Sequence, residues 1–165
     1  GTGLLLCSRK PEPLMAGGTG SESMMQQMPE HLPDRAEAGT LNVPGIAGLA
    51  AGLRHIRKQG VDRIFHREQR AAQRCIALLK KYPFQIFAGE HQSGTVSFVP
   101  EMDCEAMADW LAGYGIAVRA GLHCAPLAHL SAGTAETGTV RISFGHDAGE
   151  SQIMALEEAF ARIKD

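Results

Sequence analysis

The sequence predicts an α+β protein that ends in a small mixed or antiparallel sheet with helices on one face. Two observations lead to this class. Apolar residues recur at helical spacing through two consecutive stretches in the first half of the chain, the second reaching Leu79. From Phe84 onward the period changes to two, and strand and helix patterns follow in the order strand, strand, helix, strand, loop, strand, helix.

Residues 1–44 differ in composition from the rest and are expected to form a separate part. Leu4–Ser8 is a short apolar run after Gly3, which predicts a buried strand that needs a sheet to join. Residues 15–42 are rich in Gly, Ser, Met, Gln and Pro, which predicts a long loop. The chain also begins without methionine inside a turn-like segment, so we interpret it as cut from a longer protein, with residues 1–44 as one part and 45–165 as a C-terminal domain.

Two helices are expected next. Asn42–Gly45 has the composition of a helix start, and Gly60 ends the first helix. Asp62 is expected to cap the second helix, which ends before Tyr82-Pro83. Cys75 lies on the apolar stripe of this second helix, which favours a structural role for its side chain.

The remaining elements follow from the same two periods. Asp103 is expected to cap a helix that Gly113 or Gly115 ends, and the stretch from Arg119 to Glu136 is predicted to be irregular. The expected strands include Phe84 and Ile86 and cover residues 95–99, 116–118 and 139–144, and the last helix covers residues 150–163.

Composition excludes several classes of function. Lys plus Arg number 16 against 18 Asp plus Glu, with no long run of either sign, so nucleic acid is not an expected partner. No apolar stretch is long enough to cross a membrane, and we expect a soluble protein. The four cysteines form no C-x-x-C pair, which favours reduced thiols in the cytoplasm.

The candidate site is the segment Arg119–Pro126, where Cys124 follows a predicted strand. Cys124 is close in sequence to Arg119, His123 and His129, and neighbouring cations favour the nucleophilic thiolate form of a cysteine. Two alternatives stay open from the local sequence. Cys124 could be a small buried hydrophobe, or it could bind zinc with His123 and His129, although the usual C-x-x-C spacing is missing and we expect no metal.

Three other positions carry weaker signals. Cys104 lies in the first turn of a predicted helix, where the helix dipole favours a thiolate, although a packed side chain is the simpler interpretation. Arg141 lies among apolar strand residues and is either a solvated side chain or an anchor for a carboxylate. The Gly17–Ser21 loop could bind a phosphate through backbone N–H groups, but it lacks the ending of a Walker loop.

Three segments together resemble cysteine desulfurases, which are class V members of the fold-type-I pyridoxal-phosphate enzymes. Gly1–Leu5 resembles the segment that follows the cofactor-binding lysine in that family. Arg35–Asn42 resembles its R-x-E-x-G-T-x-N element, and Arg119–Ala125 resembles its R-x-G-x-H-C-A signature. The resemblance spans nearly the whole chain and implies the C-terminal part of a three-layer PLP-transferase, so that residues 1–44 would come from the large cofactor-binding domain.

The resemblance also implies a reaction and its residues. Cys124 would take sulfur from a cysteine substrate, leaving alanine and a Cys124 persulfide for a sulfur-acceptor protein in iron–sulfur cluster assembly. Arg141 would hold the substrate carboxylate, with Arg119 and His123 as further substrate contacts. Gly18, Thr19 and Gly20 would reach the phosphate of pyridoxal 5′-phosphate in the partner subunit of a homodimer.

The chain departs from the family pattern at the cofactor ring. The Schiff-base lysine and the upstream histidine and aspartate have no counterpart, so this chain alone is expected to be inactive and not to bind pyridoxal phosphate. Two other classes remain as alternatives. One is a selenocysteine lyase or aminotransferase of the same family, and the other is a cofactor-free thiol or sulfur-carrier domain.

Overall fold

The computed structural model describes residues 2–164, and the chain divides between Lys58 and Gln59 into two compact units. The domain boundary expected after residue 44 falls near the start of helix α1 (Val43–Gln59), whereas the units divide at the end of that helix. The difference has a physical basis, because a continuous helix carries the chain past residue 44 without a break. The assignment of residues 1–44 to a cofactor-binding domain stays a prediction.

The first unit is built mostly from loops. Its described elements are the 3-10 helix η1 (Asp34–Ala36) and α1. The strand expected over Leu4–Ser8 is wrong, since this run has no strand pairing and the side chain of Leu6 is 94% exposed. A strand is stable only when its backbone groups pair with a neighbour, and the described part of this unit contains no sheet for it to join.

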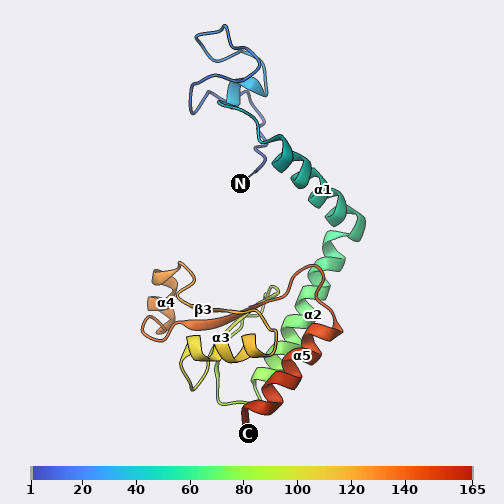
Figure 1. Cartoon of the computed structure of the whole chain (residues 1–165), viewed down its shortest axis with the longest axis vertical. Helices are drawn as coiled ribbons and strands as arrows, with labels where there is room; N and C mark the ends of the chain where they lie inside the picture. Colours follow the sequence, from blue (N-terminus) through green and yellow to red (C-terminus); the bar gives the residue numbers. More distant parts are fainter. Residues whose placement is uncertain (1, 165) are drawn as a thin grey trace. The chain divides into compact units, whose positions relative to one another are not determined.

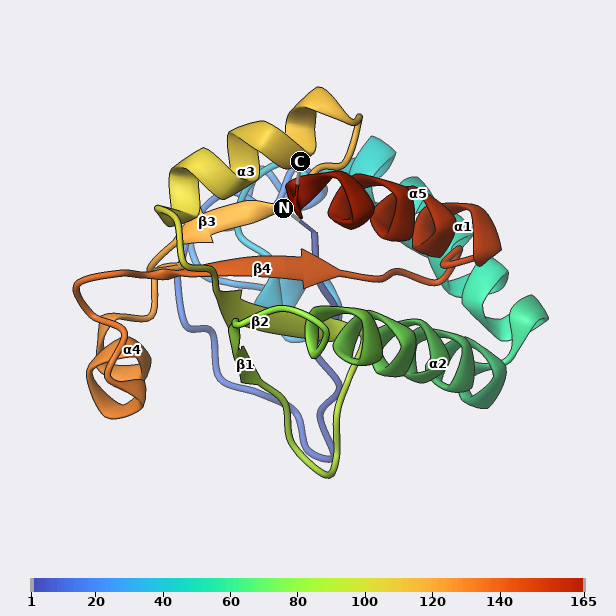
Figure 2. The ribbon, with the colours of Figure 1, turned by 90° about the horizontal axis from the view of Figure 1, so that it is seen from below.

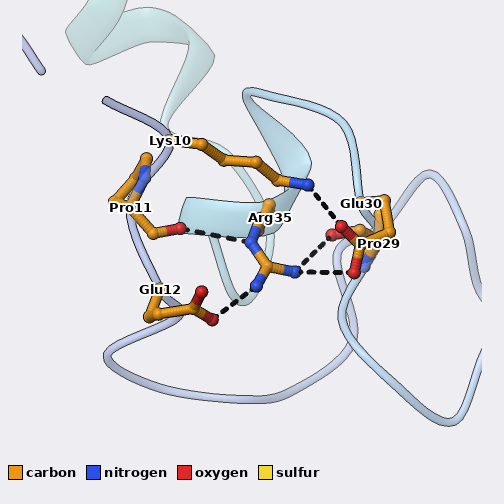
Figure 3. A network of polar contacts seen from close by, with 6 residues as sticks. All are labelled: Lys10, Pro11, Glu12, Pro29, Glu30 and Arg35. Carbon is orange, nitrogen blue, oxygen red and sulfur yellow. Dashed lines mark hydrogen bonds and ion pairs between the residues drawn. The ribbon is translucent and has the colours of Figure 1, made fainter. Parts of the chain in front are cut away.

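Arg35 in η1 holds two loop segments of the first unit, at residues 11–12 and 29–30, as Figure 3 shows. Its Nε atom donates to the carbonyl of Pro11 at 3.1 Å, and Nη1 donates to Glu30 at 3.1 Å and to the carbonyl of Pro29 at 3.5 Å. Nη2 donates to Glu12 at 2.5 Å. Because the side chain is only 11% exposed, these bonds satisfy a nearly buried guanidinium and link segments up to 24 residues apart.

Asn42 starts α1. Its Oδ1 accepts from the backbone N–H of Gly45 at 3.0 Å, which is the contact of a helix N-cap. Its Nδ2 donates to Thr2 Oγ1 at 3.2 Å, so the same side chain also ties down the start of the chain. Since α1 spans Val43–Gln59, the predicted helix and its end at Gly60 are confirmed.

The second unit contains one four-stranded antiparallel sheet in the order β1-β2-β4-β3 (Figure 2). The strands are β1 (Gln85–Phe87), β2 (Thr95–Val99), β3 (Arg119–Gly121) and β4 (Thr139–Ser143). The helices of this unit are α2 (Val61–Leu79), α3 (Cys104–Gly113), the short α4 (Pro126–Ala132), α5 (Glu150–Ala161) and the 3-10 helix η2 (Arg162–Lys164). This architecture confirms the α+β class, and every strand pair is antiparallel.

One face of this sheet is buried. In β2, Val96 and Phe98 are fully buried, and their cross-strand partners Ile142 and Val140 in β4 point to the same side. The helices α2, α3 and α5 supply the rest of this core (Figure 1). The core side chains from these helices include Cys75, Leu79, Met107, Leu111, Leu156 and Phe160. The alternate side chains of the strands, such as Ser97 and Arg141, therefore lie on the opposite face of the sheet.

Three local predictions need correction. The strand expected at residues 116–118 forms instead at Arg119–Gly121, because Ile116 N–H donates to Leu111 O at 3.1 Å and closes the end of α3. Helix α2 starts at Val61 with Gly60 as its N-cap, so Asp62 lies inside the helix. The region predicted as irregular contains both β3 and α4, a helix of seven residues that is too short for a clear period.

Other elements agree closely with the sequence. Strand β2 has its predicted bounds, and Asp103 caps α3 by accepting from Glu105 N at 2.9 Å and Ala106 N at 3.1 Å. Helix α5 begins at Glu150 as expected and passes into η2 after Ala161. Among residues 2–164, no helix combines the length and apolar character needed to span a bilayer.

Removing the α3 cap should cost a measurable part of the stability of the second unit. We expect Asp103→Ala to lower the free energy of unfolding by about 1 kcal/mol, because two backbone N–H groups lose their acceptor. Urea unfolding followed by fluorescence of Trp110, the one tryptophan and a residue of α3, measures this change. Asp103→Asn keeps an acceptor and should stay close to the parent, so equal losses in both variants would contradict the capping role.

Candidate functional site

The predicted site lies on a tight turn between β3 and α4. Ala125 N–H donates to Leu122 O at 2.9 Å, and the two central residues, His123 and Cys124, have φ angles of 52° and 59°. This hydrogen bond and two positive φ angles are the marks of a type I′ turn, which normally holds Asn and Gly. Residues with a Cβ atom adopt this region at a cost of roughly 1–3 kcal/mol each, and such strain is concentrated at functional sites.

The turn exposes the thiol of Cys124. Its Sγ atom lies 3.7 Å from Nη2 of Arg119, so a guanidinium contacts the sulfur directly. The interpretation of Cys124 as a small buried hydrophobe is therefore wrong. An accessible sulfur in contact with a guanidinium is suited to act as a nucleophile toward a bound substrate.

Arg119 and Arg141 lie side by side on the open face of the sheet. The register pairs Arg119 in β3 with Arg141 in β4, and Arg141 with Ser97 in β2. The same row ends at Phe87 in β1, which pairs with Ser97. Side chains in one cross-strand row point to the same face, so the two predicted arginines and the Cys124 loop belong to one surface.

Arg141 differs from a solvated surface arginine. The residue is half-buried, and its Nε atom is buried without a hydrogen-bond partner within residues 2–164. A buried donor without a partner is unfavourable and marks a position where a ligand oxygen can bind. The planar guanidinium fork matches a carboxylate, which favours the anchor interpretation of this residue.

His123 lines a small hollow of about 170 Å³. Its Nε2 atom is 2.9 Å from Thr139 Oγ1, and its ring lies 5.7 Å from the ring of His129. His129 is buried, and its Nδ1 atom is 2.8 Å from Thr134 Oγ1. Burial, followed by the nearby charges of Arg141, His129 and Arg119, holds the pKa of His123 below its usual value.

The other candidate thiols are less suitable. Burial raises the pKa of Cys75 to about 12, and burial together with Asp103 and Glu105 raises the pKa of Cys104. The helix-dipole interpretation of Cys104 is thus overruled by its packing. Among the described residues, no three His, Cys, Asp or Glu side chains gather as a metal ion would require.

The predicted phosphate loop lies in the first unit, whereas Cys124 lies in the second. Thr19 is buried, and its Oγ1 accepts from the N–H groups of Ser21 at 3.3 Å and Glu22 at 3.0 Å. The backbone N–H groups of Gly18, Thr19 and Gly20 make no hydrogen bond to any residue between 2 and 164. Consecutive free N–H groups in a loop are the donor set that a phosphate needs, so this part of the chain fits that group.

Sequence reasoning missed the residues that support the turn. Thr139 and Thr134 hold the two histidines, and Gly138 packs against Gly121 so closely that a Cβ on Gly138 would lie 2.9 Å from Gly121 Cα. Gly121 and Gly138 both have positive φ angles of 98° and 64°. The motif Thr137-Gly138-Thr139 was a possible signal, because a glycine just before a strand often marks a close backbone approach.

Comparison with known proteins identifies related sequences. The family model described as Aminotransferase class-V matches residues 1–156. A probable cysteine desulfurase of Methanothermobacter thermautotrophicus is 33% identical over an alignment that covers 99% of this chain and 44% of that protein. A probable cysteine desulfurase of Pyrococcus abyssi is 36% identical over an alignment that covers 80% of this chain and 34% of that protein. The chain thus spans less than half the length of these relatives.

Solved structures show the same fold. The apo structure of cysteine desulfurase from Thermococcus onnurineus NA1 has a TM-score of 0.80 and 30% identity, over 90% of this chain and 38% of that one. The cysteine desulfurase CsdA from Escherichia coli has a TM-score of 0.78 and 30% identity, over 92% of this chain and 38% of that one. These similarities support the predicted C-terminal PLP-transferase fold.

The Gly121–Gly138 contact can be tested with a matched pair of substitutions. Gly133→Ala meets open space at a φ of 71° and should lower the free energy of unfolding by about 1 kcal/mol. Gly138→Ala adds a backbone clash, so we expect roughly 1–3 kcal/mol of further loss. Urea unfolding of both variants gives the comparison, and equal losses would show that the close approach does not matter.

Proposed function

Because the class V aminotransferase model matches residues 1–156, this chain belongs to that family, and on this premise we propose that it is the C-terminal part of a cysteine desulfurase. The observation that carries the proposal is the exposed Cys124 thiol on a strained turn, 3.7 Å from Arg119. An aminotransferase that only moves amino groups needs no such thiol. The names of the relatives favour cysteine over selenocysteine as the substrate.

In the proposed reaction, Cys124 is the sulfur acceptor. Its thiolate attacks the sulfur atom of the substrate cysteine, and a new S–S bond forms as the substrate Cβ–S bond breaks. The electron pair of the broken bond stays on the substrate carbon, which takes up a proton and becomes alanine. The products are alanine and a persulfide on Cys124, and pyridoxal phosphate supplies the electron sink for this step when it is bound.

Two arginines would orient the substrate for this attack. Arg141 has a buried, unpartnered Nε and a planar fork, and we assign it to the substrate carboxylate. Arg119 contacts the sulfur of Cys124 and lies beside Arg141 in the sheet register, so it can contact both the thiol and the substrate. His123, expected among the substrate contacts, directs its Nε2 to Thr139 instead.

The residues of this chain fit only part of the cofactor. The N–H groups of Gly18, Thr19 and Gly20, which have no partner among residues 2–164, are suited to its phosphate, and we propose that they serve the partner subunit of a homodimer. The lysine, histidine and aspartate that would hold the ring have no counterpart in the sequence. We therefore assign the bound cofactor to the longer parent polypeptide and expect this chain alone to be inactive.

The persulfide would then pass to a second protein. We propose a sulfur-acceptor protein of iron–sulfur cluster assembly as this partner, and a cytoplasmic location for the parent enzyme. The partner is proposed because the Cys124 sulfur is exposed, and a buried persulfide could not be transferred. The location is proposed because free thiols persist in a reducing compartment.

The role of Cys124 can be tested in the extended, cofactor-loaded polypeptide. We expect Cys124→Ser to abolish the persulfide and the release of sulfide from cysteine, because serine cannot accept sulfur in this way. Mass spectrometry of the protein and a sulfide assay measure the two losses. Cys7→Ser, at another exposed cysteine, should leave both unchanged. Full desulfurase activity in Cys124→Ser would refute the proposal.

The role of Arg141 predicts a change in substrate binding. Arg141→Lys keeps the positive charge but loses the planar fork, so we expect KM for cysteine to rise roughly 10–100-fold, the range for losing a hydrogen bond to a charged group. Steady-state kinetics of the extended polypeptide measures this value. Arg162→Lys, at an exposed arginine paired with Glu158 on the last turn of the chain, is the control. An unchanged KM in Arg141→Lys would remove Arg141 from the carboxylate site.

A further inference from the structure

We propose that His123 is a positioning residue, whose hydrogen bond to Thr139 holds the turn that points the Cys124 thiol outward beside Arg119. The inference deepens the proposed function and rests on it for the reaction of the thiol. The position of the thiol itself depends only on contacts within the chain. It can therefore be tested without cofactor or substrate.

The turn needs an external support. His123 and Cys124 both carry a Cβ atom at positive φ angles, and each would gain by relaxing toward negative φ. The single backbone bond between Ala125 N and Leu122 O is also compatible with other turn types. Local backbone preference thus works against the observed conformation, and a contact outside the turn must offset it.

The His123–Thr139 bond is placed to give this support. Thr139 is buried, begins β4 and pairs across the sheet with Gly121, the last residue of β3. The bond from His123 Nε2 to Thr139 Oγ1 therefore links the turn back to the strand beside it. With the ring of His123 directed inward, the next side chain, Cys124, points outward to Arg119.

The ring itself is poorly placed to contact a substrate. Its Nε2 atom is occupied by Thr139, and its Nδ1 atom is buried and has no partner within the described residues. The charged or titratable groups that face the ring are Arg119 from β3, Arg141 from β4 and His129 from α4, and all of them disfavour its protonation. The inward direction of the ring and its bond to Thr139 favour a role in holding neighbouring residues in place.

Thiol labelling of the whole 165-residue chain tests the proposal. Cys7 and Cys124 are exposed while Cys75 and Cys104 are buried, so limited iodoacetamide treatment and mass spectrometry give a Cys124:Cys7 ratio with its own internal reference. The test variants are Thr139→Val, which removes the hydroxyl at nearly constant shape, and Thr139→Ser, which restores a hydroxyl. Thr137→Val is the matched control, because its hydroxyl donates to Gly138 O and not to His123.

We expect Thr139→Val to lower the Cys124:Cys7 ratio by up to about five-fold, because the loss of one hydrogen bond changes a conformational equilibrium constant by this factor. Thr139→Ser should recover most of the ratio, and Thr137→Val should match the parent. An unchanged ratio in Thr139→Val, or no recovery in Thr139→Ser, would overturn the proposal.

Labelling of Cys75 or Cys104 reports a general opening of the fold. In that event His123→Phe replaces Thr139→Val, since it keeps a ring but removes both nitrogens, and a decrease within the same limit is expected. An unchanged ratio in His123→Phe overturns the proposal as well. Because no desulfurase activity is measured, these outcomes are independent of whether the proposed reaction is correct.

Discussion

In β2 and β4, successive side chains point to opposite faces of the sheet, and this alternation is the constraint on which the rest of the second unit depends. It places Phe98 and Val140 in the core, and it places their neighbours Ser97 and Arg141 on the open face. A shift of one residue in the β2–β4 register would bury the arginine and expose the core. The stability of the unit therefore enforces the position of the proposed carboxylate anchor.

The second requirement is a close approach of two backbones beside the thiol. Gly121 ends β3 and Gly138 precedes β4, and a Cβ atom at position 138 would clash with the backbone of Gly121. This contact brings Thr139 within reach of His123. The nucleophile is thus positioned by a sheet, a glycine pair and a threonine hydroxyl. Neither the glycine pair nor the threonine hydroxyl takes part in the proposed chemistry.

Much of this arrangement was predictable from the sequence, because it depends on local periodicity and on recognisable caps. The strand Thr95–Val99 and the cap Asp103 were found where expected. Grouping Cys124 with Arg119 required only their proximity in the sequence. Placing Arg141 in the same row required the strand register, which no local pattern specifies.

The errors have a common physical cause, which is that tertiary contacts decide how backbone groups are satisfied. Ile116 is of a residue type that favours strands, but its N–H group donates to Leu111 O and closes the end of α3. Leu4–Ser8 has a strand pattern but no neighbouring strand in the described part of its unit. Thr139 could be assigned to a strand, but its bond to His123 depends on a turn geometry that a His-Cys pair does not normally adopt.

That turn also matters for anyone who redesigns this chain for stability. Its backbone is one for which Asn-Gly is the preferred pair, so a procedure that optimises each position against the backbone will tend to replace His123 and Cys124. The resulting protein would be more robust and would lack its reactive sulfur. Positions 123 and 124 should therefore be held fixed during such design, because the two residues with a strained backbone include the reactive cysteine.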